Sequence, residues 1–206
     1  MERSVGLYLL VLVVTLRYTT TVNGRAASPT AMDLIRASCK TTLHASLCVR
    51  CLSSYAGSIK GSNADHLLAK AAISVSLNNT KSASVFISKL GRVSGIKPRE
   101  YQAVKDCIST MTNSVASLSQ SVQELDQMAR TRGHDFEWHM SNAETWVASA
   151  LTNQNICARG FDDSSMNGHV KNAITSRMVY VSQVTSNALA LVNRFAVRHR
   201  KGIRHP

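Results

Sequence analysis

Residues 101–125 read YQAVKDCISTMTNSVASLSQSVQEL, and this stretch decides the fold class. Its apolar residues recur in alternating steps of three and four: Tyr101, Val104, Ile108, Met111, Val115, Leu118, Val122 and Leu125. A seven-residue repeat of this kind places one apolar seam on one face of a long helix. Such seams are typical of helices that pack in bundles at shallow angles. The stretch therefore predicts a long amphipathic helix that packs against other helices.

The same period recurs in three further segments of the chain. Their seam residues are Ile174, Met178, Val181, Thr185, Ala188, Val192 and Phe195 in one; Ala69, Ile73, Ser76, Thr80, Ala83, Ile87 and Leu90 in a weaker one; and Met140, Ala143, Val147 and Ala150 in a shorter one. The composition agrees with helix packing, because only 5% of the residues are aromatic and only three are proline. Four long helices are therefore expected.

Turn-forming residues separate these segments. Gly91 and Gly95 follow the first, Pro98 suits the first turn of the second, and residues 131–133 and 160–168 form the later breaks. Short connections make consecutive helices antiparallel neighbours. We therefore expect an all-α fold: an up-down-up-down four-helix bundle over residues 63–196, preceded by an α-hairpin over residues 30–58 that bends near Leu43-His44.

The N-terminal residues are those of a secretory signal peptide. Arg3 precedes an apolar run of 12 residues, 5–16, which is too short to span a bilayer as a helix. Small residues that suit cleavage follow, so residues 1–24 are predicted to be removed, and the cleavage could extend to residue 27. A buried N-terminal helix is the alternative. Asn78-Asn79-Thr80 is a glycosylation sequon at Asn78, usable on this secretory route.

Five cysteines also fit an exported chain, in which two disulfides would leave one thiol. Cys107 and Cys157 lie 24 and 26 residues on either side of Thr131, the expected turn between the second and third long helices. In an antiparallel helical hairpin such positions are neighbours, so this pairing is geometrically allowed. Cys39 and Cys48 straddle the bend of the N-terminal hairpin and are able to pair, which leaves Cys51 free. A Cys39–Cys51 bond with Cys48 free stays open as the alternative.

The formal net charge is +12, and part of it is concentrated at residues 197–206, which are expected to form a basic C-terminal tail. A basic protein associates with polyanions. The sequence nevertheless lacks the interleaved aromatic residues of nucleic-acid binders. Acidic polysaccharide or an acidic protein face is the expected partner, with a simply solvated end as the alternative.

Catalytic motifs are not found. No nucleophile elbow, Walker A loop or glycine-rich dinucleotide motif is present. His134 and His139 are five residues apart and point to different helix faces, so no metal site and no cofactor are expected. Asp162 and Asp163 precede the last helix and are interpreted as helix caps, and Cys51 lacks catalytic partners. Trp138 and Trp146, eight residues apart, are interpreted first as core residues and second as partner contacts.

The order of these elements resembles the plant invertase and pectin methylesterase inhibitor family. The similarity rests on Cys39 and Cys48 with eight residues between them, on the segment 101–107 (YQAVKDC), on 135–138 (DFEW), on 142–152 (NAETWVASALT) and on 186–191 (SNALAL). It covers about residues 30–196. It implies the disulfides Cys39–Cys48 and Cys107–Cys157, with Cys51 outside the family framework.

The resemblance also implies inhibition without chemistry. Family members sequester a cell-wall enzyme in a one-to-one complex that covers its substrate cleft. His134-Asp135-Phe136 stands where invertase inhibitors carry Pro-Lys-Phe, so pectin methylesterase is the expected target and invertase the alternative. A basic wall-binding module without an enzyme target is the alternative of another class. The protein is expected in the apoplast or cell wall, and the candidate partner-contacting residues are Phe136, Trp138, Asn142, Thr145 and Trp146.

One residue departs from the family pattern next to the fourth framework cysteine. Many members have Thr directly before it, whereas this chain has Ile156. That position is expected to lie close to the enzyme, so the substitution bears on the strength of inhibition.

Overall fold

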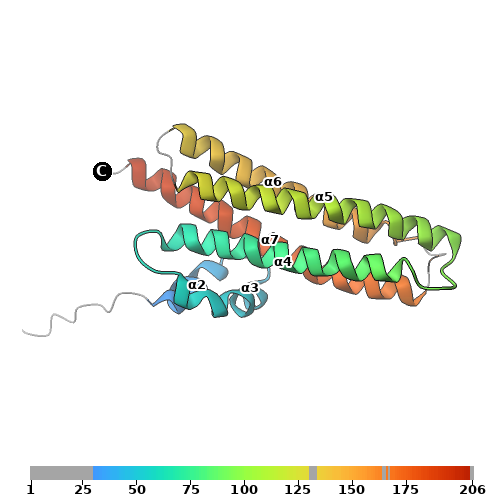
Figure 1. Ribbon diagram of the computed structural model, residues 1–206. Helices are drawn as coiled ribbons and strands as arrows, with labels where there is room; N and C mark the ends of the chain where they lie inside the picture. The colour runs from blue at the N-terminus through green and yellow to red at the C-terminus, as the bar shows by residue number, and fades with distance from the viewer. Residues whose placement is uncertain (1–29, 130–133, 164–165, 167, 205–206) are drawn as a thin grey trace, which may run out of the picture.

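The computed structural model describes residues 30–129, 134–163, 166 and 168–204 (Figure 1). Within these ranges the chain is helical and contains no strand. The elements are α2 (Ala31–Cys39), α3 (Ala45–Leu52), the short 3₁₀ helix η1 (Ser53–Ser58), α4 (Ala64–Leu90), α5 (Pro98–Met128), α6 (His134–Arg159) and α7 (His169–Arg204). The expected all-α class, with a short hairpin ahead of four long helices, is confirmed.

The four long helices form a bundle in which each packs against two others. α4 contacts α5 and α7, and α6 contacts α5 and α7. Figure 1 shows α5 beside α6 and α4 beside α7, with the chain reversing direction between consecutive long helices. The short helices α2 and α3 lie against α4 and α7, at the N-terminal end of α4.

Pro98 and Gly91 stand at the helix ends that the sequence predicts, and the structure adds a capping box at the start of α2. Pro98 occupies the first turn of α5, where its missing N–H group leaves no hydrogen bond unmade. Gly91 caps the C-terminus of α4, and a Cβ atom there would lie 3.1 Å from Cγ1 of Val104, so α5 passes close to this cap. Thr30 and Asp33 form a capping box at the start of α2.

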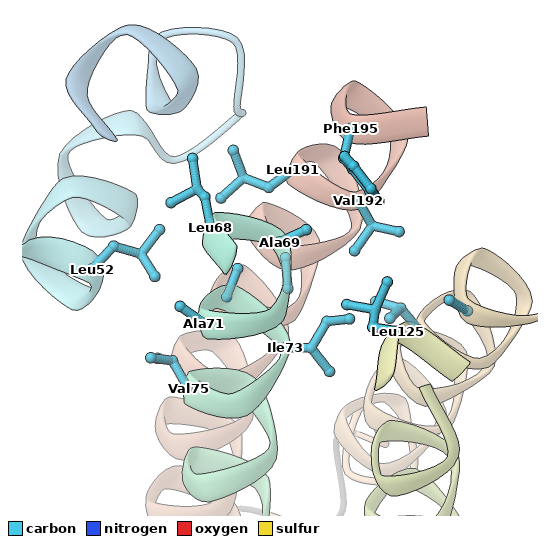
Figure 2. Packing of buried hydrophobic residues seen from close by; sticks show 14 of the residues in the cluster. Leu52, Leu68, Ala69, Ala71, Ile73, Val75, Leu125, Leu191, Val192 and Phe195 are labelled. Atoms are coloured by element: carbon cyan, nitrogen blue, oxygen red, sulfur yellow. The ribbon is translucent and has the colours of Figure 1, made fainter. Parts of the chain in front are cut away.

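The predicted seams face the centre of the bundle. Ile73, Leu118, Val147 and Met178, one from each long helix, are fully buried. Figure 2 shows Ile73 of α4 near Leu125 of α5. Tyr101 is the exception among the seam residues of α5, because it is 48% exposed.

A buried polar cluster sits within this apolar core and joins all four long helices. The Gln154 side-chain amide of α6 donates to the hydroxyl oxygens of Thr80 in α4 (3.1 Å) and Ser114 in α5 (3.0 Å). One turn away, the hydroxyls of Ser76 in α4 and Thr185 in α7 are 2.7 Å apart. Because an unpaired buried polar group is destabilising, this cluster favours one register of the four helices.

Two disulfides link the chain as expected. Cys39–Cys48 joins α2 to α3 across 9 positions, and Cys107–Cys157 joins α5 to α6 across 50 positions. Cys51 is not disulfide-bonded. The alternative pairing of Cys39 with Cys51 is therefore not the one in this structure.

The expected boundary of a C-terminal tail at residue 197 is wrong. α7 continues to Arg204 without interruption. Arg198 donates to both carboxylate oxygens of Asp65 in α4 (2.8 Å each), and Arg200 donates to Glu137 in α6 (3.0 Å). These ion pairs hold the end of α7 against two other helices, which the positive charge by itself did not indicate.

Two other expectations concern segments outside the described residues, namely the signal peptide over residues 1–24 and the turn at residues 131–133. Among the helices that are described, none combines the length and the apolar character needed to cross a membrane.

Candidate partner-docking surface

The outer side of the α5–α6 pair carries an unusually long stretch without charged residues. In α5, residues 107–123 contain no Lys, Arg, Asp or Glu, and in α6 the same holds for residues 145–158. Amide and hydroxyl side chains take their place, including the exposed Asn113, Thr145 and Thr152. The cores of protein–protein interfaces are depleted in charge in the same way. We call this side of the molecule the α5–α6 surface.

Serine side chains bring the two helices close together beneath this surface. The Ser114 hydroxyl donates to the Ala150 carbonyl (3.1 Å), and the Ser121 hydroxyl donates to the Ala143 carbonyl (3.0 Å). Both serines are fully buried. Together with the Cys107–Cys157 bond, these contacts fix one helix against the other, so the surface is rigid before any partner arrives.

A polar cluster lies at the end of the surface where α6 begins. The Glu124 carboxylate of α5 is 2.6 Å from Nδ1 of His139 and accepts a longer hydrogen bond from the Asn142 amide (3.4 Å). The indole ring of Trp138 lies at a steep angle to the His139 ring, and the centroids of the two rings are 4.8 Å apart. Trp138 itself is 57% exposed. The interpretation of Trp138 as a core residue is therefore wrong.

Trp138, Asn142 and Thr145 share one face of α6, because they lie four and three residues apart. Thr145 is exposed, and its hydroxyl donates to the Ser141 carbonyl (2.8 Å). Trp146 is half-buried. Four of the five candidate residues are therefore at least partly accessible on α6.

Phe136, the fifth candidate, is not on this surface. It is only 6% exposed, and its ring stacks on His199 with centroids 3.6 Å apart and meets Phe195 edge-on at 5.9 Å. The continuation of α7 past residue 196 brings His199 over Phe136. The fold expected from the sequence ends at residue 196, before His199, so this cover over Phe136 is not predicted by it.

The opposite end of the surface holds an open groove of about 400 Å³ next to the Cys107–Cys157 bond. Ile156 lines it and is 44% exposed, so the residue that departs from the family pattern is accessible. Arg99 pairs with Asp163 at 2.5 Å across this end. Asp163 therefore has an ion-pair partner in α5, whereas the expected role of Asp162 and Asp163 as caps of the last helix stays a prediction.

Glu144, the third acidic residue of α6, lies on the side of this helix that faces α7. Burial raises the pKa of Glu144 above its usual value of 4.5, although nearby Arg200 acts in the opposite direction and Glu137 adds to the rise. Because Glu144 and Glu137 lie on the α7 side of α6, this group is separate from the α5–α6 surface.

Cys51 and Asn78 lie on other parts of the molecule. Cys51 is half-buried on α3, with its sulfur 3.9 Å from the Tyr180 hydroxyl of α7. Burial, followed by the contact with Cys51, raises the pKa of Tyr180. Asn78 is exposed on α4, whereas Thr80 of the same sequon is buried.

The described residues bring together no group of three or more side chains that could hold a metal ion. The α5–α6 surface is thus a rigid, largely uncharged flank of two helices, with the exposed Trp138 at one end and an open groove at the other.

Comparisons with known proteins agree on one family. A family model described as plant invertase/pectin methylesterase inhibitor matches residues 33–191. Pectinesterase inhibitor 9 of Arabidopsis thaliana is 43% identical over 91% of this chain and 93% of its own length, and pectinesterase inhibitor 11 of the same plant is 43% identical over 84% and 85%. The crystal structure of a mutant form of a pectin methylesterase inhibitor from Arabidopsis matches with a TM-score of 0.60 at 16% identity, covering 80% of this chain and 96% of that one.

Proposed function

The chain belongs to the plant invertase/pectin methylesterase inhibitor family, and from this we infer that it is a non-enzymatic inhibitor of a pectin methylesterase. Relatives that are 43% identical over most of both chains are named as pectinesterase inhibitors, which favours this enzyme over invertase. The single observation that supports the mode of action is the rigid, largely uncharged flank of α5 and α6.

The inhibitor acts by forming a non-covalent one-to-one complex that covers the substrate cleft of the enzyme. α6 has 26 residues and is therefore about 39 Å long, which is enough to lie across a cleft. A standard interface buries about 1,600 Å² in total. Trp138, Asn142, Thr145 and Trp146 supply contacts at one end, and Ile156 supplies an apolar contact at the other.

Methanol release from methyl-esterified pectin tests the proposal directly. Adding the pure, disulfide-bonded protein to a plant pectin methylesterase is expected to lower the rate until one inhibitor is present per enzyme. A parallel assay of sucrose hydrolysis by a plant invertase is expected to show no change. Undiminished methanol release at excess protein would contradict the proposal, and loss of invertase activity alone would transfer it to the other enzyme.

The site of action is the apoplast or cell wall. Removal of residues 1–24, glycosylation at Asn78 and the two disulfides belong to this proposal, because an oxidising secretory route permits all three. Asn78 lies on α4, across the bundle from α6, so a glycan there leaves the α5–α6 surface uncovered. Expression of the full chain in plant cells, followed by analysis of the apoplastic fluid and treatment with a glycosidase, checks both points.

The net charge of +12, which is +11 once residues 1–24 are removed, supports a second, weaker association, an electrostatic contact between the protein and acidic pectin.

A further inference from the structure

Charge is distributed very unequally between the two halves of the bundle. α4 and α7 together contain ten Lys or Arg residues and one acidic residue, whereas α5 and α6 contain three basic and seven acidic residues. Because α4 packs against α7 and α5 packs against α6, the sequence asymmetry becomes a spatial one. One side of the molecule is strongly basic, and the proposed docking side is not.

The uncovered part of the basic side is the region where α4 ends and α7 begins. At the other end, α3 packs on α4 and α7 through residues such as Leu52, which Figure 2 shows near Leu68, and the ion pairs with Asp65 and Glu137 neutralise Arg198 and Arg200. We therefore define the basic patch as Lys81, Lys89, Arg92 and Arg177. The proposed glycan at Asn78 lies three positions before Lys81 and so borders the patch at that end, whereas Lys89 and Arg92 lie 11 and 14 positions beyond it.

The cations of this patch have no acidic partner in the part of the chain that the structure describes. Lys81, Lys89 and Arg92 are exposed, and among the described residues no carboxylate pairs with any of them. Lys81 and Lys89 are eight positions apart, so they lie about 12 Å apart along α4, and Arg92 follows directly after the Gly91 cap of this helix. Lys89 and Arg92 also border a shallow hollow of about 280 Å³.

Apolar and aromatic groups lie beside these charges. Arg177 donates to the Ser82 hydroxyl (2.7 Å), and its guanidinium lies 5.8 Å from the centre of the half-buried Phe86 ring. Val85 is 56% exposed on the same helix. A sugar polymer with one carboxylate per unit fits such a patch, because carboxylates meet the cations and sugar C–H groups meet the apolar side chains.

We propose that the basic patch of α4 and α7 binds a linear polyuronate, the demethylated stretches of pectin, while the α5–α6 surface remains free for an enzyme. The choice of polymer rests on the proposed function, since a pectin methylesterase turns each methyl ester into a carboxylate. The inhibitor would then be held on the polymer where the enzyme has already acted.

Binding of the disulfide-bonded protein to labelled polygalacturonate, measured without enzyme, tests this inference. The triple variant Lys81→Glu/Lys89→Glu/Arg92→Glu is expected to bind roughly tenfold more weakly or worse, and wild-type binding is expected to weaken steeply between low and moderate salt. The matched control is Lys40→Glu/Arg50→Glu/Lys60→Glu, which changes the net charge equally at exposed positions of the N-terminal segment. It is expected to lose less than about threefold, because it leaves the patch intact.

Four outcomes would overturn the inference: no wild-type binding, equal losses in both triple variants, equal affinity for fully methyl-esterified pectin, or equal affinity for DNA of similar length. Circular dichroism establishes that both variants are folded.

Methanol release in the presence of each variant separates the two proposals. The patch variant is expected to inhibit the enzyme normally on a short soluble substrate, and a protein that inhibits nothing could still bind polygalacturonate through this patch.

Discussion

Trp138 and Phe136 lie two positions apart on α6 and have opposite environments. Trp138 is 57% exposed beside the Glu124–His139 pair, whereas Phe136 is 6% exposed beneath His199. An exposed tryptophan at the edge of a rigid, uncharged surface is the kind of residue that dominates the energy of an interface. At the scale of single residues, Trp138 is therefore the main candidate for partner binding.

The variant Trp138→Ala is expected to weaken inhibition of a pectin methylesterase by about tenfold or more, because it removes the largest accessible apolar side chain of the surface. Methanol release at increasing inhibitor concentration measures the change. Val179→Ala is the matched control, since Val179 is 48% exposed on α7. Equal inhibition by wild type and Trp138→Ala would remove this residue from the interface.

Glu144 is expected to make stability depend on pH. Because its pKa is raised in the folded protein, the folded state holds the proton more tightly than the unfolded chain does. Its contribution to stability is therefore largest below pH 4.5 and falls as the pH rises through the folded-state pKa. Glu144→Gln is expected to be more stable than wild type at pH 7, with the difference disappearing at low pH. Urea unfolding at both pH values checks the sign, and a less stable variant at pH 7 would contradict it.

At the scale of elements, the α5–α6 hairpin combines a covalent link with close packing along two long helices. Ser114 and Ser121 donate to backbone carbonyls of α6, and the Cys107–Cys157 bond lies further along the same interface. The docking surface depends on this register, because its contacts come from both helices. Loss of the disulfide should therefore affect stability first and inhibition second.

Cys107→Ala/Cys157→Ala is expected to lower the free energy of unfolding by about 4 kcal/mol, because the bond closes a loop of 50 positions in the unfolded chain. The Cys39–Cys48 bond closes a loop of only 9 positions, so Cys39→Ala/Cys48→Ala is expected to lower the free energy of unfolding by about 2.6 kcal/mol. Guanidinium unfolding of the two variants and the wild type measures both losses. A larger loss for the short loop would contradict the chain-entropy argument.

At the scale of the whole molecule, the end of α7 connects elements that are far apart in the sequence. Arg198 pairs with Asp65 of α4, Arg200 pairs with Glu137 of α6, and His199 covers Phe136. Exposed ion pairs contribute little individually, so most of the effect of this segment should come from the buried aromatic contact.

Removing residues 197–206 is expected to destabilise the protein by about 1–3 kcal/mol, because Phe136 loses the ring that covers it. Thermal unfolding measures the loss. Inhibition at 25 °C is expected to stay within about threefold of wild type, since Trp138 remains in place. The milder variant His199→Ala tests the aromatic contact by itself, and an unchanged melting temperature in both variants would contradict the role assigned to α7.

Sequence periodicity was sufficient for the fold class, since the seams of the four helices, apart from Tyr101, and the placement of two cysteine pairs agree with the structure. Ile174, Met178, Val181, Thr185 and Val192 are fully buried as the period required. Periodicity works here because an apolar face must be covered, whichever neighbour covers it.

The environment of polar and aromatic residues was decided only by the tertiary structure. A serine is stable in solvent, and it is also stable in a core where its hydroxyl reaches a carbonyl group. The burial of Ser114 and Ser121 therefore cannot be predicted without knowing that α6 lies beside α5. Phe136, a candidate contact by resemblance to the family, is buried because α7 continues past residue 196 and places His199 over its ring. The separation into a basic side and a largely uncharged side also depends on packing. The sequence gives the order of the charged residues, but the arrangement of the four helices determines which of them share a face.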